Sequence, residues 1–134
     1  MPVLDASVCV SLFRADDPGH QASLQWLERA LQGDELIVSP VILLAEVAAA
    51  LGRGLGDTKL SRQVVELLRA RQIIDLLPVH EALAGRAAEV AAEQKVRGCN
   101  AIYVALAEQL EMELVTLDRQ QLERVAEVVV TRNP

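Results

Sequence analysis

The chain has 134 residues, of which 51% are hydrophobic and only 2% aromatic, and its formal net charge at pH 7 is −6. This length is typical of one domain, so we expect a single domain over residues 1–134 with a core of Leu, Val, Ile and Ala. The acidic balance excludes an overall electrostatic attraction to nucleic acid, although it allows a local basic groove. No apolar run reaches the roughly 20 residues of a transmembrane helix, and the N-terminus lacks a basic leader, which predicts a cytoplasmic protein.

Short apolar runs alternate with longer helical patterns along the chain. The runs predict strands at residues 2–5, 35–40, 73–79, 113–118 and 127–131. The longer patterns predict helices at residues 17–32, 41–54, 58–71, 80–96, 100–111 and 119–126. Strands separated by helices indicate βαβ units, and therefore an α/β fold with a parallel sheet covered on both faces.

Local signals predict where several helices begin and end. Ser39 and Pro40 are typical of a helix start, because Ser caps the helix and Pro needs no N–H partner in its first turn. The three glycines within residues 52–59 predict a loop between two helices. Cys9 and Cys99 have no metal-type spacing, and we expect two buried or partly buried thiols.

Acidic residues follow two of the expected strands at the points where these strands end. Asp5 closes the first strand and Asp118 closes the fourth. Parallel α/β sheets bind ligands at the carboxyl ends of their strands, so the two side chains would meet there if these strands are neighbours. Each residue also precedes a helical segment, where Asp is a favoured N-cap, and both interpretations remain open for each.

Glu46 is the only polar residue between Val41 and Leu51. Burial of an isolated carboxylate costs several kcal/mol or raises its pKa until it is neutral. A partner, a cation or a catalytic role would explain a carboxylate in so apolar a helix. The alternative is that neighbouring alanines mark a thin exposed edge on which Glu46 meets water.

Asn100 precedes another apolar helix and is expected to cap it. Because that helix should be buried, Asn100 would face the sheet edge that carries Asp5 and Asp118. Three carboxylates and an amide in one place suit a hard ion such as Mg²⁺ or Mn²⁺, which removes their mutual repulsion and attracts phosphate. Hydrolysis of a phosphodiester is the reaction class that such a set favours.

Four segments in this order resemble a PIN domain, in particular the VapC-type toxin ribonucleases. They are "VLDAS" (3–7), "ILLAEVAAAL" (42–51), "RGCNAIYVALAEQ" (97–109) and "LVTLDR" (114–119). The resemblance covers nearly the whole chain. It implies a three-layer α/β/α PIN-like fold with a parallel sheet of about five strands and a Mg²⁺- or Mn²⁺-dependent endoribonuclease that cleaves RNA. It also implies a homodimer, inhibited by a small antitoxin whose tail enters the acidic groove.

The resemblance also assigns roles to individual residues. The metal site of the family carries over onto Asp5, Glu46, the position of Asn100, and Asp118. Ser7 matches a small polar residue that often lies beside the metal, and Thr116 is a weaker candidate for the same supporting role. Arg97 is the best placed basic residue for contacting RNA, with a solvated loop charge as its other interpretation.

The sequence departs from the family pattern at Asn100, where the family has Asp. An amide oxygen can bind a cation but carries no negative charge. We therefore expect one weakly held ion in place of two, and reduced or lost nuclease activity.

Two other interpretations are open. A catalytically degenerate PIN-like module would bind RNA or a protein partner without cleavage, which Asn100 favours and the retained Asp5, Glu46 and Asp118 disfavour. A receiver-like phosphoprotein would need an Asp at the end of the third strand and a Lys after the last one. Asp75 lies inside the third strand and no Lys follows residue 95, which argues against a receiver.

Overall fold

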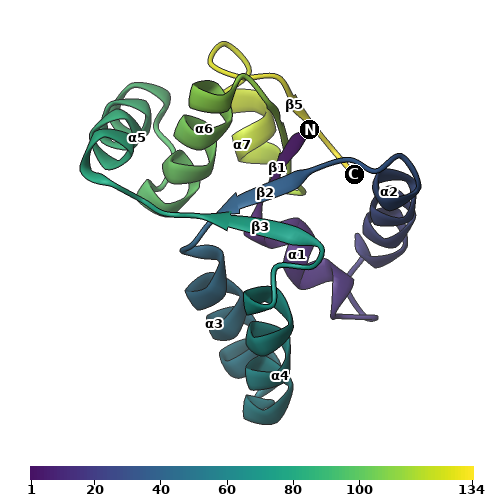
Figure 1. The fold of residues 1–134 in the computed structure, drawn as a ribbon. Coiled ribbons are helices and arrows are strands. Elements are labelled where there is room, and N and C mark those ends of the chain that lie inside the picture. The colour runs from purple at the N-terminus through teal and green to yellow at the C-terminus, as the bar shows by residue number, and fades with distance from the viewer.

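The centre of the fold is a five-stranded sheet, seen in a computed structural model that describes residues 1–134 (Figure 1). The strands are β1 (Pro2–Leu4), β2 (Ile37–Pro40), β3 (Ile74–Leu77), β4 (Glu113–Val115) and β5 (Thr131–Arg132). The helices are α1 (Ala6–Leu12), α2 (His20–Gln32), α3 (Leu43–Leu55), α4 (Thr58–Arg69), α5 (Glu81–Gln94), α6 (Gly98–Leu110) and α7 (Arg119–Arg124). All strand pairs are parallel, as the sequence predicts.

Helices cover both faces of the sheet. In Figure 1, α1, α3 and α4 lie on one side, with α2 against α1, and α5, α6 and α7 lie on the other. Val3 and Leu4 of the central strand are fully buried, because a parallel strand covered on both faces has no solvent side. This is the predicted three-layer α/β/α architecture. None of the helices has the combination of length and hydrophobicity that crossing a membrane requires.

The path of the chain changes direction beside β1. The strand order is β3-β2-β1-β4-β5, so the chain moves outward from β1 to β3 and then returns to β4 on the other side of β1. Leu4 lies opposite Val115, and the N–H of Asp5 donates to the carbonyl of Val115 over 3.1 Å. The carboxyl ends of β1 and β4 therefore form the switch point at which α/β sheets place their ligands.

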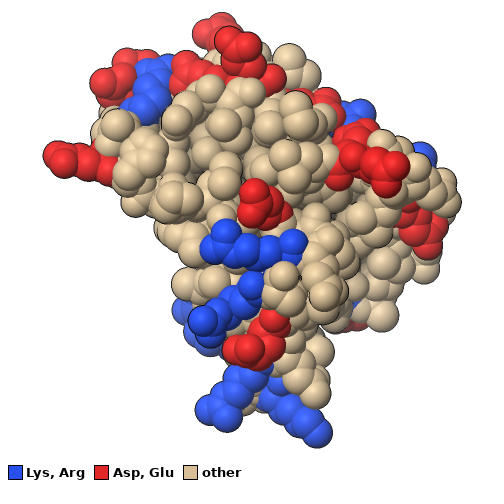
Figure 2. Space-filling model, viewed as in Figure 1, with Lys and Arg blue, Asp and Glu red and all other residues tan.

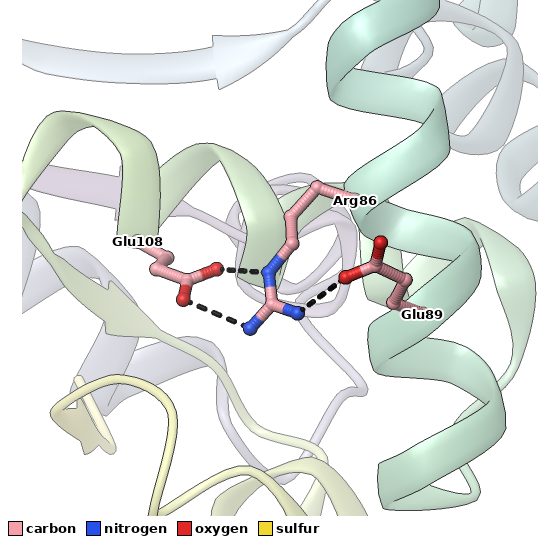
Figure 3. Close-up of polar contacts among 3 residues, drawn as sticks. All are labelled: Arg86, Glu89 and Glu108. Atoms are coloured by element: carbon pink, nitrogen blue, oxygen red, sulfur yellow. Dashed lines mark hydrogen bonds and ion pairs between the residues drawn. The ribbon is translucent and has the colours of Figure 1, made fainter.

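An ion-pair network joins α5 to α6 (Figure 3). Arg86 donates to both oxygens of Glu108, from Nε over 2.7 Å and from Nη2 over 2.9 Å, and its Nη1 donates to Glu89 over 2.9 Å. These bonds hold the pKa of Glu108 below its usual range. The side chains are partly exposed, so solvent screening limits what each pair contributes to stability. The bidentate geometry nevertheless fixes how α6 packs on α5.

Two predictions about α3 are wrong. Ser39 and Pro40 belong to β2, because the Ser39 hydroxyl donates to the carbonyl of Leu4 over 2.6 Å and Pro40 pairs with Leu77. The predicted glycine loop at residues 52–59 is mostly helix. α3 continues to Leu55, where Gly56 ends it with a φ of +65°. Packing of α3 against α4 overrides the low helix propensity of the two preceding glycines.

Three further boundaries or burial predictions also need correction. The last strand begins at Thr131 and not at residue 127, because Val129 turns into the core, with its N–H bonded to the carbonyl of Val125. The helix predicted from residue 17 begins at His20. Cys9 is buried as expected, whereas Cys99 is exposed in the first turn of α6.

Gln121 of α7 is fully buried, and neither Nε2 nor Oε1 has a hydrogen-bond partner. An unsatisfied buried polar group costs about 1–3 kcal/mol. We expect Gln121→Met, which keeps the length of the side chain, to raise the free energy of unfolding by about 1 kcal/mol or more in urea denaturation. The exposed neighbour provides the control, since Gln120→Met should change nothing. A Gln121→Met protein no more stable than wild type would contradict this expectation.

Candidate active site

The four residues predicted to form a metal site line one cleft at the switch point. Asp5 and Asp118 follow β1 and β4, while α3 contributes Glu46 and α6 contributes Asn100. The cleft has a volume of about 650 Å³. It gathers side chains from both ends of the chain and from both helical layers, which only the folded sheet brings together.

Asp5 lies at the bottom of this cleft and is 3% exposed. Its Oδ2 accepts hydrogen bonds from the hydroxyls of Ser7 and Thr116, each over 2.7 Å. Burial raises the pKa of Asp5 above its usual range, and the two hydroxyls act in the opposite direction. Because both hydroxyls engage Oδ2, the other oxygen, Oδ1, has no side-chain partner.

Ser7 and Thr116 are themselves fixed by the backbone that follows β4. The N–H of Leu117 donates to Ser7 Oγ over 3.0 Å, and the N–H of Asp118 donates to Thr116 Oγ1 over 3.0 Å. The two hydroxyls therefore connect Asp5 to the loop that carries Asp118. Both hydroxyls touch Asp5 directly.

Glu46 is half-buried and has a specific partner. The hydroxyl of Tyr103 in α6 donates to its Oε1 over 2.6 Å. Burial raises the pKa of Glu46, the Tyr103 bond lowers it, and the nearby Asp5 adds to the increase. Tyr103 is fully buried, and burial together with the Glu46 bond raises its pKa far above the usual range. Glu46 is thus anchored in the wall of the cleft and is not a carboxylate on an exposed edge.

No motif in the sequence points to a role for the Tyr103 hydroxyl, which holds Glu46 in place. Tyr103→Phe keeps the ring and removes this hydroxyl. Since hydrogen bonds to charged groups contribute about 1.5–3 kcal/mol and Glu46 is partly exposed, we expect the free energy of unfolding to fall by about 1–2 kcal/mol. Urea denaturation at neutral pH measures the difference. Tyr103→Leu, which also loses ring volume, should cost more, and a Phe variant as stable as wild type would refute the contribution of the hydroxyl.

Asn100 is not the cap of α6, and this prediction is wrong. The helix begins at Gly98, with Arg97 in extended conformation at the N-cap and its carbonyl accepting from the N–H of Ala101 over 2.9 Å. Asn100 is therefore the third residue of the helix. It is 9% exposed, it lines the cleft, and its side-chain amide makes no hydrogen bond to the protein. Because the amide lines the open cleft and has no partner in the protein, it is available to a ligand.

The two aspartates at the strand ends differ in whether they also cap the helix that follows. Asp118 caps α7, with Oδ1 accepting from the N–H groups of Gln120 and Gln121 over 2.9 and 3.3 Å. Asp5 occupies the N-cap position of α1 but makes no capping hydrogen bond. The cap interpretation is therefore correct for Asp118, which also lines the cleft, and is not supported for Asp5.

Two arginines and a further acid complete the lining of the cleft. Arg97 and Arg53 are exposed, and neither forms an ion pair. Asp17 comes from the loop before α2, and its Oδ1 accepts from the N–H of Gly19 over 2.8 Å. The sequence analysis did not identify Asp17, because no motif surrounds it and only the folded loop brings it to the cleft.

The donor chemistry of the cleft fits one hard divalent cation. Carboxylate and amide oxygens are the ligands that Mg²⁺ and Mn²⁺ prefer. No three Asp, Glu, His or Cys side chains are grouped closely enough to hold an ion by themselves. The fit therefore depends on the unpartnered amide of Asn100 acting together with Asp5 and Glu46, and it does not extend to a second ion.

The sequence matches the PIN domain family over residues 3–128. The chain therefore belongs to the PIN domain family, as its motifs predict. Comparison with curated proteins found no match.

Several solved structures share this fold, and one of them is a toxin. Mycobacterium tuberculosis VapC20, a sarcin–ricin-loop-cleaving toxin, has 16% identity and a TM-score of 0.79 over 100% of both chains. FitAcB from Neisseria gonorrhoeae has 22% identity and a TM-score of 0.73, covering 98% of this chain and 97% of the other. VapBC2 from Rickettsia felis, bound to a DNA fragment of its promoter, has 12% identity and a TM-score of 0.71 over 99% and 98%. At these identities the likeness is one of fold.

Proposed function

We propose that the protein is a metal-dependent endoribonuclease of the VapC toxin type. The observation that carries the proposal is the convergence of Asp5, Glu46, Asn100 and Asp118 in one cleft at the switch point of a PIN domain. The similarity to VapC20, a toxin that cleaves the sarcin–ricin loop, supports RNA as the substrate. Such an enzyme acts where its RNA is found, so we place it in the cytoplasm.

Each residue of the cleft would have its own role in binding the ion or the RNA. Asp5 through Oδ1, Glu46 and the amide oxygen of Asn100 would hold one Mg²⁺ or Mn²⁺. A divalent ion at such a site supplies charge neutralisation for a phosphodiester and activates water for its hydrolysis. Ser7 and Thr116 keep Asp5 in its orientation, and Asp118 adds negative charge beside it at the same sheet edge. Arg97 is free to contact a phosphate of the RNA.

The second candidate is a catalytically degenerate PIN module that binds RNA or a protein. Asn100 favours it, since its amide lacks the charge of the family's Asp and the acids of the cleft are not grouped closely enough to hold an ion by themselves. The anchored Glu46 and the hydroxyl pair around Asp5 favour the enzyme, because a binding module needs neither feature.

We also propose a small antitoxin as protein partner and a homodimer as the working assembly. A structural neighbour from Klebsiella pneumoniae, with 17% identity and a TM-score of 0.69, is a toxin–antitoxin complex, which supports the first part. An antitoxin tail that carries Arg would find complementary charge in a cleft lined by Asp5, Asp17, Glu46 and Asp118.

Cleavage of structured RNA with and without divalent ions tests the enzyme proposal. Purified protein is incubated with hairpin-containing RNA in Mg²⁺, in Mn²⁺ and in EDTA, and the products are mapped. We expect cleavage at discrete loop positions with either ion and none in EDTA. Binding of the RNA without cleavage under all three conditions would favour the degenerate module.

A further inference from the structure

The charges of this acidic protein are unevenly distributed along the chain. Residues 52–71 contain five Lys or Arg and two Asp or Glu, whereas the rest of the chain contains eight and 17. This basic segment forms the end of α3, the short loop and α4. Figure 2 shows Lys and Arg gathered at the lower end of the molecule, over α3 and α4, while Asp and Glu dominate its upper part.

Three of these cations are free to bind a ligand, and we call Arg53, Lys59 and Arg62 the basic arm. All three are exposed, and none forms an ion pair. The other two arginines of the segment are paired, one with Glu66 over 3.6 Å and one with Asp75 over 3.7 Å. Asp57 forms no ion pair with the arm, and its Oδ1 accepts the N–H of Leu60 as the cap of α4.

The basic arm reaches the cleft through Arg53. One face of α3 lines the cleft with Ala45, Glu46, Ala49, Ala50 and Arg53. At 1.5 Å per residue, Arg53 lies about 10 Å along the helix from Glu46. The alanines between them give this part of the cleft a lining of small apolar side chains. A chain molecule held at Glu46 and Asp5 can therefore continue along α3 to the arm.

The arm is held on a rigid support. Ser61 of α4 donates to the carbonyl of Ala48 in α3 over 3.1 Å. Leu51 of α3 and Val64 and Leu68 of α4 are buried between the helices and the core. The cations therefore keep a fixed place relative to the cleft, which a binding surface for an extended ligand requires.

We propose that the basic arm binds the sugar–phosphate backbone of a single-stranded RNA segment that continues from the strand held in the cleft. The inference rests on the proposed ribonuclease function. Phosphates approaching the cleft meet the carboxylates of Asp5, Glu46 and Asp118, so part of the binding energy must come from outside it. Exposed Lys and Arg contact phosphates without reading sequence, which makes the arm a source of affinity and not of base selection.

Binding of a fluorescent RNA of about 12 nucleotides, a length within the range of single-strand-binding grooves, tests the arm. Fluorescence anisotropy is measured in EDTA over a series of salt concentrations, so that cleavage cannot occur. For the double variant Lys59→Gln/Arg62→Gln we expect weaker binding and a plot of log affinity against log salt that is shallower by about 1.4, which is 0.7 for each lost contact. Arg62→Gln alone should account for half of this change.

Arg29→Gln is the matched control, because Arg29 is an exposed helical arginine without an ion pair on α2. It should bind RNA as wild type does. Equal affinity and salt dependence of wild type and double variant would overturn the proposal and leave the arm to an acidic protein partner, and a wild type without measurable RNA binding would also overturn it. Since the assay contains no divalent ion, absence of nuclease activity would refute the proposed enzyme without altering this result.

Discussion

Asn100→Asp is expected to raise the affinity for Mn²⁺ by at least about tenfold, or 1.4 kcal/mol, and to increase the rate of RNA cleavage. The variant restores a carboxylate at a 9%-exposed position that faces Asp5 and Glu46 across the cleft. A unit charge about 4 Å from a cation contributes roughly 4 kcal/mol at an effective dielectric of 20, so even a partly screened carboxylate exceeds the tenfold threshold. Isothermal titration calorimetry measures the affinity, and a hairpin RNA reports the rate.

The natural control is the other asparagine of the chain. Asn133→Asp adds the same charge at an exposed position near the C-terminus and should leave Mn²⁺ affinity unchanged. In the absence of metal, Asn100→Asp should lower the melting temperature, because the new carboxylate is repelled by Asp5 and Glu46. Equal Mn²⁺ affinity and equal cleavage for wild type and Asn100→Asp would show that Asn100 is not part of the metal site.

Asp5→Asn is expected to reduce Mn²⁺ affinity and RNA cleavage by more than about 100-fold, since residues that merely support metal ligands already contribute 10- to 100-fold. The amide can still accept the hydroxyls of Ser7 and Thr116, so the local structure should persist. Burial raises the pKa of Asp5, which means that the folded state disfavours its ionised form. The metal-free Asn variant should therefore unfold at a higher temperature than wild type at pH 8, because the ionised wild-type carboxylate is more favourable in the unfolded state than in the folded one.

Loss of activity with gain of stability separates a functional carboxylate from a structural one. Asp34→Asn, in the exposed turn after α2, is the matched control and should alter neither property. An Asp5→Asn protein that melts below wild type would mean that the carboxylate stabilises the fold, and retained Mn²⁺ binding would remove Asp5 from the proposed site.

The overall fold could be predicted because its determinants are local. Buried parallel strands appear as short apolar runs, and the residues that end them must meet at one sheet edge. This is why Asp5 and Asp118 could be brought together from the sequence without any knowledge of their distance.

The features that the sequence did not reveal depend on contacts between distant segments. Packing on α4 carries α3 past Gly52 and Gly54, against their helix propensity. The bond between Tyr103 and Glu46 joins α6 to α3, and periodicity within either helix contains no sign of it. Asn100 is the third residue of α6 and not its predicted cap. The N-cap position is taken by Arg97, which lacks a typical capping side chain. Because of that difference of three residues, the amide does not cap the backbone and lies in the lining of the cleft.

A crystal soaked in MnCl₂, with the ion located by anomalous scattering, tests the central claim most directly. The account predicts one Mn²⁺ in the cleft, bound by Asp5 Oδ1 and the amide oxygen of Asn100 near Glu46. A cleft without manganese at millimolar concentration, or an ion that does not contact Asp5, would contradict it.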